Sequence, residues 1–103
     1  MRELTEANFQ ESIASGNAIV DCWAPWCGPC KMFMPIIEAA SEIHQDISFF
    51  KVDVDTAPGI AQKFGIRSVP TLMAFQNGEL KIARSGAMDP ASLEAFFAEA
   101  FNK

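Results

Sequence analysis

Two cysteines lie three residues apart in the segment Trp26-Cys27-Gly28-Pro29-Cys30, where an apolar run gives way to a helical one. Residues i and i+3 share one face of a helix, so the two sulfur atoms can approach bonding distance. Cys27 at the helix start is expected to have a lowered pKa, because unpaired N–H groups and the helix dipole favour its thiolate. Pro29 suits the first turn, where its missing N–H has no helical partner. The spacing therefore has the geometry of a reversible disulfide.

A C-x-x-C pair also occurs in zinc and iron–sulfur sites. A structural zinc site takes four ligands, whereas this chain has three cysteines and one histidine. His44 lies fourteen residues beyond Cys30 on the same predicted helix, about 21 Å along its axis. Together with Cys27 and Cys30, Cys22 gives the C-x4-C-x2-C spacing of plant-type ferredoxins. However, no fourth cysteine follows, and Cys22 falls within a predicted strand. We therefore expect no metal, and we expect His44 to be a solvated helix-end residue rather than a base for Cys27.

An acid and a base occupy unusual places in apolar runs. Asp21 lies inside residues 18–24, where a buried charge without a partner is costly. One hypothesis places Asp21 beneath the two thiols, with a raised pKa, as the acceptor of the Cys30 proton. The alternative is an acid at a strand end that hydrogen bonds hold. Lys51, inside residues 49–52, either extends to the surface or approaches Asp21 from a neighbouring strand.

Two further residues have two readings each. Pro70 follows the strand-compatible Val69, so it is either an ordinary strand-start proline or part of a rarer cis peptide bond. Trp26 is either a core residue or a partly exposed contact for a partner, and its place in a turn outside the helix favours exposure.

The elements that must position these residues alternate between strand-like and helical runs, which indicates an α/β fold. Apolar spacing and turn signals predict a helix opened by Thr5 and closed by Gly16, a strand over 18–24, a helix over 28–44 kinked near Pro35, a strand over 47–54, a short helix over 58–64, a hairpin of 71–76 and 79–84 around Asn77-Gly78, and a last helix opened by Asp89-Pro90. The result is a central mixed sheet of four to five strands, with helices on both faces.

Composition and charge limit the classes of function. The 103 residues are 50% hydrophobic, enough for one domain over residues 1–103 with its own core. A net charge of −5 without a basic run argues against nucleic acid and membrane partners. The first residues lack the apolar centre of a signal peptide, so we expect a cytoplasmic, monomeric protein. Cytoplasmic thiols are kept reduced, which favours a catalytic or metal-binding cysteine pair over a structural one.

Taken in order along the chain, these motifs resemble the thioredoxin family. The matching segments are Val20-Asp21, residues 23–31, Pro35, residues 51–55, residues 64–72, Asn77-Gly78 and Gly86-Ala87. The resemblance implies a thioredoxin fold and an enzyme that reduces protein disulfides through a reversible Cys27-Cys30 pair. It also implies that this chain binds no cofactor. Its redox group is the disulfide itself, and the NADPH and FAD belong to a partner thioredoxin reductase.

The resemblance also assigns roles to individual residues. Cys27 would be the exposed attacking thiolate and Cys30 the resolving thiol, with Asp21 and Lys51 beneath them. A docking surface for disulfide-containing substrate proteins would be formed by Trp26, Gly28, Pro29, Val69, a cis Pro70, Thr71, Gly86 and Ala87. In the implied cycle, Cys27 forms a mixed disulfide with the substrate and Cys30 then releases the reduced substrate.

The chain departs from the family pattern at two positions. Cys22 stands where an aromatic residue is usual, and Ser85 where an apolar one is common. Alternation places Cys22 on the sheet face opposite Asp21, so we expect a small buried residue rather than a third redox thiol. Two other functions are compatible with the same fold: a disulfide oxidase or isomerase, and a non-enzymatic binding subunit. Gly28-Pro29 favours the reductant, because this pair resembles reducing thioredoxins.

Overall fold

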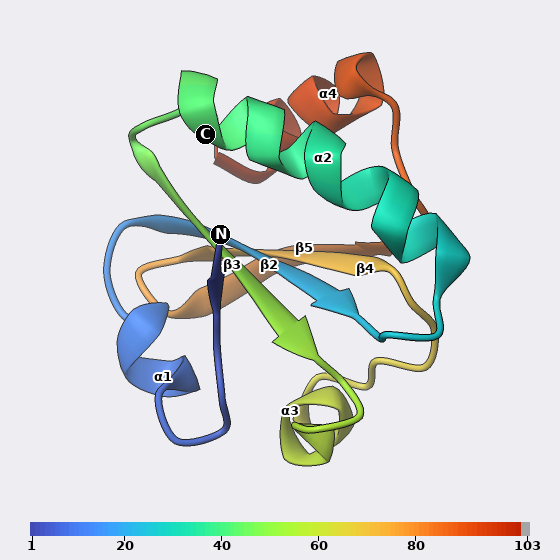
Figure 1. The fold of residues 1–103 in the computed structure, drawn as a ribbon. Coiled ribbons are helices and arrows are strands. Elements are labelled where there is room, and N and C mark those ends of the chain that lie inside the picture. Colours follow the sequence, from blue (N-terminus) through green and yellow to red (C-terminus); the bar gives the residue numbers. More distant parts are fainter. Residues whose placement is uncertain (102–103) are drawn as a thin grey trace.

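Five strands form one mixed sheet in the computed structural model, which describes residues 1–101 (Figure 1). The strands are β1 (Arg2–Glu3), β2 (Asn17–Trp23), β3 (Ile47–Asp53), β4 (Thr71–Gln76) and β5 (Glu79–Ser85). Their order across the sheet is β1-β3-β2-β4-β5. The first three are parallel, whereas β4 is antiparallel to both β2 and β5, so the predicted mixed sheet is confirmed.

Helices cover both faces of the sheet, as the sequence predicts. Two of them, α2 (Gly28–Ile43) and α4 (Pro90–Phe101), pack on one face, and α1 (Phe9–Ser12) and α3 (Pro58–Lys63) on the other (Figure 1). Between residues 1 and 101, no helix combines the length and the apolarity that a membrane crossing requires.

Strand β2 divides the core into two layers, because alternate side chains point to opposite faces. Ile19 packs with Phe33 of α2 and Phe96 of α4. Val20 and Cys22 pack in the layer of α1 and α3. By the same alternation, Asp21 lies on the face that α2 covers. The central strand thus delivers one acid to the layer whose helix begins at the cysteine pair.

The N-terminal region differs from the predicted helix. Helix α1 begins after Asn8 rather than after Thr5, and it ends at Ser12. Asn8 is the N-cap residue, and its Oδ1 accepts a hydrogen bond from the Thr5 backbone N at 2.8 Å, so Thr5 lies before the helix start. Strand β1, which sequence patterning did not predict, pairs with β3 instead.

Other expected elements occur with boundaries that differ by at most one residue. Helix α2 runs from Gly28 to Ile43 through Pro35, and the kink there stays a prediction. Asn77 and Gly78 have φ values of 51° and 84°, the left-handed conformations that the predicted tight hairpin needs. The Asp89 side chain accepts a bond from Ser92 N at 2.8 Å and caps α4.

Candidate active site

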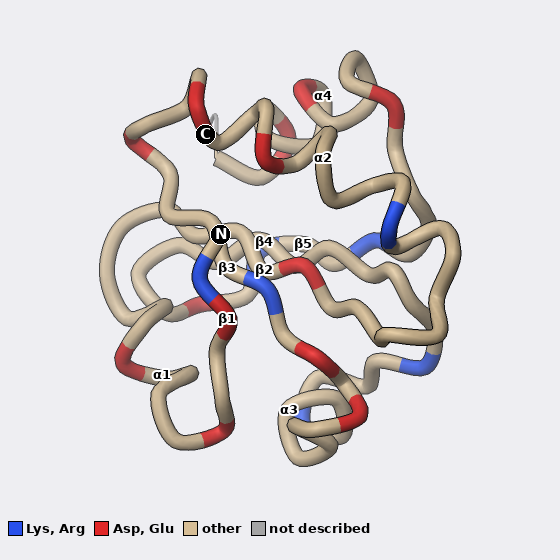
Figure 2. The backbone as a smooth tube through the Cα atoms, viewed as in Figure 1, with Lys and Arg blue, Asp and Glu red and all other residues tan. Residues whose placement is uncertain are grey.

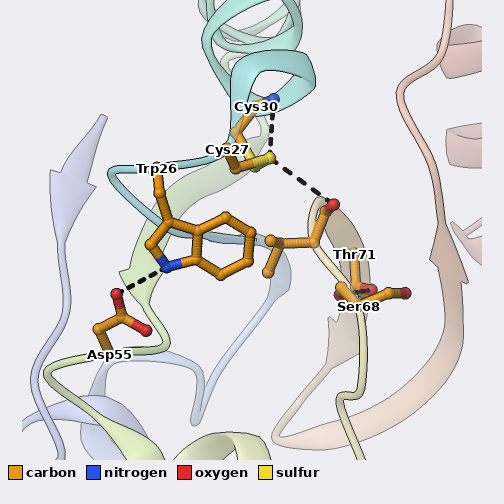
Figure 3. The surroundings of a disulfide bond; sticks show 7 residues. Trp26, Cys27, Cys30, Asp55, Ser68 and Thr71 are labelled. Carbon is orange, nitrogen blue, oxygen red and sulfur yellow. Dashed lines mark hydrogen bonds between the residues drawn. A yellow bond between two sulfur atoms is a disulfide. The ribbon is translucent and has the colours of Figure 1, made fainter.

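Cys27 and Cys30 form a disulfide at the start of α2 (Figure 3). Cys27 is the N-cap residue, and the Cys30 backbone N donates a hydrogen bond to its Sγ at 3.1 Å. An N–H group that points at this sulfur also stabilises its thiolate when the pair is reduced. The helix start therefore does two things: it brings the sulfurs together and it favours negative charge on Cys27.

Both sulfurs are more enclosed than the resemblance implied. Cys27 is 3% exposed and Cys30 is fully buried, so the expectation of an exposed Cys27 is wrong for this oxidised form. The reason is packing, since the two cysteines form a small apolar cluster with Ala24, against which Val69 packs. Cys27 is still the less buried of the two.

Residues far apart in the sequence meet beside the disulfide (Figure 3). The Cys27 Sγ lies 3.6 Å from the carbonyl oxygen of Val69, in the segment that leads into β4. Trp26 is 70% exposed, and its Nε1 donates a hydrogen bond to Asp55 Oδ2 at 2.9 Å. Gly86 N donates to the Pro70 carbonyl oxygen at 2.8 Å, which joins the end of β5 to the start of β4. The hydrogen bond to Asp55 therefore holds the Trp26 indole in place, although most of the ring faces outward.

The eight expected docking residues differ in exposure. The exposed ones are Trp26, Gly28, Pro29, Gly86 and Ala87. Val69 is half-buried, whereas Pro70 and Thr71 are buried. The Val69–Pro70 bond is cis, and Thr71 Oγ1 donates a hydrogen bond to the Ser68 carbonyl oxygen at 2.7 Å. Pro70 and Thr71 therefore support the surface from below, and their role in contacting substrates stays a prediction.

A hollow of about 260 Å³ extends the surface on one side of Trp26. Its lining is mostly apolar and includes Val54, Ile66, Ser68 and Val69. The hollow lies between the indole and the segment before β4, so one apolar side chain of a bound polypeptide can enter it next to the disulfide.

Asp21 is completely buried, and neither of its carboxyl oxygens has a hydrogen-bond partner among residues 1–101. Burial raises the pKa of this carboxyl to about 7; the Lys51 charge partly opposes that rise, and the Glu3 charge adds to it. An acid with such a pKa exchanges its proton near neutral pH. The structure thus supplies the raised pKa that the hypothesis for Asp21 requires, while proton transfer itself stays a prediction.

Lys51 reaches the neighbourhood of Asp21 but does not pair with it. The two residues are directly opposite in the β2–β3 register. The Lys51 Nζ instead lies 3.8 Å from Glu3 Oε1 and 5.3 Å from the centre of the Trp23 ring. The expected approach of Lys51 to Asp21 from the neighbouring strand is confirmed, since the Lys51 charge lowers the Asp21 pKa, but the ammonium group forms its salt bridge with Glu3 on the unpredicted strand β1.

Sequence reasoning assigned no role to Glu3 or Asp55. Asp55 follows β3 directly, and the carboxyl ends of parallel strands β2 and β3 lie at one sheet edge. Polar residues just beyond such ends are a signal for a functional site. Glu3 carried no comparable signal, because a two-residue strand shows no alternation.

Cys22 is a free, buried thiol on the opposite sheet face from Asp21. Burial, together with the nearby Asp21 charge, raises its pKa to about 12. The disulfide joins Cys27 to Cys30 and leaves Cys22 out, in agreement with the expected packing role.

His44 ends α2, as predicted, but it is not a freely solvated side chain. Its Nε2 lies 2.8 Å from the Glu94 carboxylate, and its ring packs edge-on against Phe97. Within residues 1–101, no three His, Cys, Asp or Glu side chains are grouped so that they could hold a metal ion.

Comparison with known proteins identifies the family. The family model for thioredoxin matches residues 1–99. Putative thioredoxin 2 of Streptomyces coelicolor is 44% identical over 92 residues, which are 88% of this chain and 69% of that protein. A thioredoxin of Porphyra purpurea is 41% identical over 90% of both chains, and one of Chlamydia muridarum is 43% identical over 87% and 88%. With its Cys27–Cys30 disulfide, the chain belongs to the thioredoxin family, whose members are protein-disulfide oxidoreductases.

Proposed function

We propose that this thiol–disulfide oxidoreductase works as a reductant of disulfides in other proteins, and that a thioredoxin reductase returns it to the dithiol state. The observation that carries the proposal is the Cys27–Cys30 disulfide at a helix start, beside the exposed indole of Trp26. Gly28-Pro29 between the cysteines supports reduction over oxidation, through its likeness to reducing members of the family.

In the first step, the Cys27 thiolate attacks one sulfur of a substrate disulfide. A bond forms between Cys27 and that sulfur, and the other substrate sulfur leaves as a thiolate. The Cys30 N–H group, 3.1 Å from the Cys27 sulfur, lowers the free energy of the attacking thiolate.

In the second step, Cys30 attacks the Cys27 sulfur of the mixed disulfide. The Cys27–Cys30 bond forms, the second substrate thiolate leaves, and two electrons have passed from this chain to the substrate. Cys30 must lose its proton to attack, and the Asp21 carboxylate, with its pKa of about 7, is the acceptor that we assign. Because the group is fully buried, this transfer takes place away from bulk water.

The substrate docks on the exposed part of the docking surface, with its disulfide over Cys27. Trp26 supplies apolar area at a fixed orientation, because Asp55 holds its indole N–H. The hollow beside Trp26 takes a neighbouring apolar side chain of the substrate. The chain works as a monomer in the cytoplasm, where the reductase and NADPH keep a dithiol donor reduced.

The test is NADPH-dependent reduction of insulin disulfides in the presence of a thioredoxin reductase. Wild-type chain is expected to turn over, whereas Cys27→Ser is inactive because no mixed disulfide forms. Cys30→Ser is expected to accumulate the mixed disulfide, which is visible as a mass increase. Cys22→Ala is the matched control: it also removes one thiol and is expected to keep activity. Failure of wild-type turnover with every reductase tested would contradict the proposal.

The direction of the reaction needs a separate measurement. A disulfide oxidase or isomerase would reactivate reduced or scrambled ribonuclease faster than it reduces insulin. We expect the opposite ranking. If a Cys27→Ser, Cys30→Ser double variant kept the biological activity of the chain, its surface rather than its thiols would be the functional part.

A further inference from the structure

Three charged residues form a row across three neighbouring strands. Glu3 of β1 is opposite Lys51 of β3, and Lys51 is opposite Asp21 of β2. Residues that are opposite in register project from the same face of a sheet, so the side chains follow in the order acid, base, acid. The row lies on the face that α2 covers. One ammonium group therefore has a carboxylate on each side.

Glu3 is held in place by contacts other than Lys51. Its Oε2 accepts hydrogen bonds from the Asp53 backbone N at 2.9 Å and from Trp23 Nε1 at 3.3 Å. Next to it, the Leu4 backbone N donates to the Lys51 carbonyl oxygen at 2.8 Å, which fixes β1 against β3. These bonds hold the Glu3 carboxylate beside β3.

The Lys51 ammonium follows Glu3 rather than Asp21. It lies 3.8 Å from Glu3 Oε1 and 3.9 Å from the Met34 sulfur, and it sits over the Trp23 ring. Asp21 is fully buried, and in the part of the chain that the structure describes both of its oxygens lack a hydrogen-bond partner. The nearest base to the buried carboxyl thus makes its salt bridge with Glu3, although the Lys51 charge still lowers the pKa of Asp21.

We propose that Glu3 is a positioning residue, which holds Lys51 away from Asp21 and so keeps Asp21 ready to exchange a proton near neutral pH. This inference rests on the proposed function, in which Asp21 accepts the proton of Cys30. An ammonium in contact with a buried carboxylate would stabilise the charged form, and Asp21 would then be a weaker base. Glu3 prevents that contact, and its own negative charge acts in the same direction.

The other groups around Asp21 do not provide this control. Cys27 and Cys30 of α2 are joined in the disulfide and do not titrate in the oxidised form. Cys22 projects to the opposite face. On the β4 side, the residue opposite Asp21 is the apolar Leu72, and the residue opposite Leu72 on β5 is Arg84. Arg84 pairs with Glu99 at 3.3 Å.

The experiment follows the carboxyl carbon of Asp21 by NMR as a function of pH in the oxidised full chain, with Asp21→Asn to assign the signal. Glu3→Gln keeps an oxygen for Asp53 N and Trp23 Nε1 but removes the charge that attracts Lys51. The Asp21 midpoint is expected to fall by about one pH unit or more. Glu11→Gln removes a charge on exposed α1 and is expected to leave the midpoint in place. An unchanged midpoint in Glu3→Gln would overturn the inference.

A double-variant cycle tests whether Glu3 acts through Lys51. In Lys51→Met there is no ammonium to release, so adding Glu3→Gln is expected to shift the midpoint much less than in the wild-type background. Equal shifts in the two backgrounds would mean that only the charge of Glu3 matters, and its positioning role would be wrong.

These measurements use no substrate, so they separate this inference from the proposed function. If the midpoint shifts as expected but insulin is not reduced, the proposed function fails and the role of Glu3 stands. If insulin is reduced but the midpoint does not move, only the role of Glu3 fails. In single-turnover resolution of the mixed disulfide, the pH at half-maximal rate is expected to fall with the midpoint in Glu3→Gln.

Discussion

The buried carboxyl of Asp21 couples the stability of the folded chain to pH. Folding raises its pKa from 3.8 to about 7, so the folded state binds this proton more tightly than the unfolded state. The stabilisation that this bound proton gives the folded state is complete below pH 4, and it is lost as the pH rises through 7. At pH 8 we therefore expect the unfolding free energy of Asp21→Asn to be larger than that of the wild type by up to about 4 kcal/mol.

Urea unfolding of both proteins at pH 4, 6 and 8 checks this expectation. The difference between them is expected to grow with pH, with most of the growth between pH 4 and 7. A difference that stays constant over this range would show that Asp21 has an ordinary pKa in the folded chain.

The hydrogen bond between Trp26 and Asp55 gives a second prediction for a single residue. Asp55→Ala removes the acceptor of the indole N–H and frees the exposed ring on which we propose that the substrate docks. A hydrogen bond of this kind contributes about 1 kcal/mol, so kcat/KM for insulin is expected to fall about fivefold. Asp46→Ala, which removes an exposed acid beyond α2, serves as the control. Equal kcat/KM in both variants would leave Asp55 without a role in docking.

The turn between β4 and β5 carries a prediction about an element. Gly78 has a φ of 84°, and an added Cβ would lie 3.7 Å from the Ala14 carbonyl oxygen, an ordinary contact. The cost of Gly78→Ala is therefore backbone strain, about 1 kcal/mol of unfolding free energy. Thermal unfolding measures it. Insulin reduction is expected to be unchanged, since the turn lies outside the active site.

The elements that the sequence predicted well are those with long patterns or strong end signals. The apolar stripe of α2, the Asn77-Gly78 turn and the Asp89-Pro90 helix start each determine local structure through nearby residues. The two failures lie in the first sixteen residues. Strand β1 has two residues, too few for alternation, and the N-cap position is occupied by Asn8 rather than Thr5.

The active site was predictable to the extent that its groups are neighbours in sequence. Cys27 and Cys30 follow from their spacing, and Asp21 from an acid in an apolar run. The direction in which Lys51 turns was not predictable, because it depends on Glu3, which reaches it only through β1–β3 pairing. The hydrogen bond between Trp26 and Asp55 was likewise not predictable, because it depends on how the segment after β3 lies against the loop before α2.

The disulfide contributes to the stability of the whole molecule. It closes a loop of only four residues, for which the loss of unfolded-chain entropy is worth about 2 kcal/mol. We expect the reduced chain to unfold at a lower denaturant concentration by about that free energy, in one transition for all probes. Guanidinium unfolding with and without a reductant measures the difference, and Cys27→Ser, Cys30→Ser is the control that should not respond to reductant. Equal midpoints for the oxidised and reduced wild type would contradict the prediction.

The charge of the molecule is spread rather than concentrated. Thirteen acidic residues outnumber eight basic ones, and Figure 2 shows acidic positions on the helices of both faces. We therefore expect substrate proteins to be selected at short range, by the apolar surface around Trp26, more than by a strong field of one sign.

Strand β5 forms one outer edge of the sheet, and its side chains are nearly all exposed. An open edge is a template on which a second molecule can add a strand. Here the edge carries Glu79, Lys81 and Arg84, and the register shifts between Ala74 and Phe75 of the adjoining strand. Charged side chains and an irregular hydrogen-bond ladder both oppose the addition of a strand from another molecule. These features therefore protect the folded chain against aggregation in which the sheet extends from one molecule to the next.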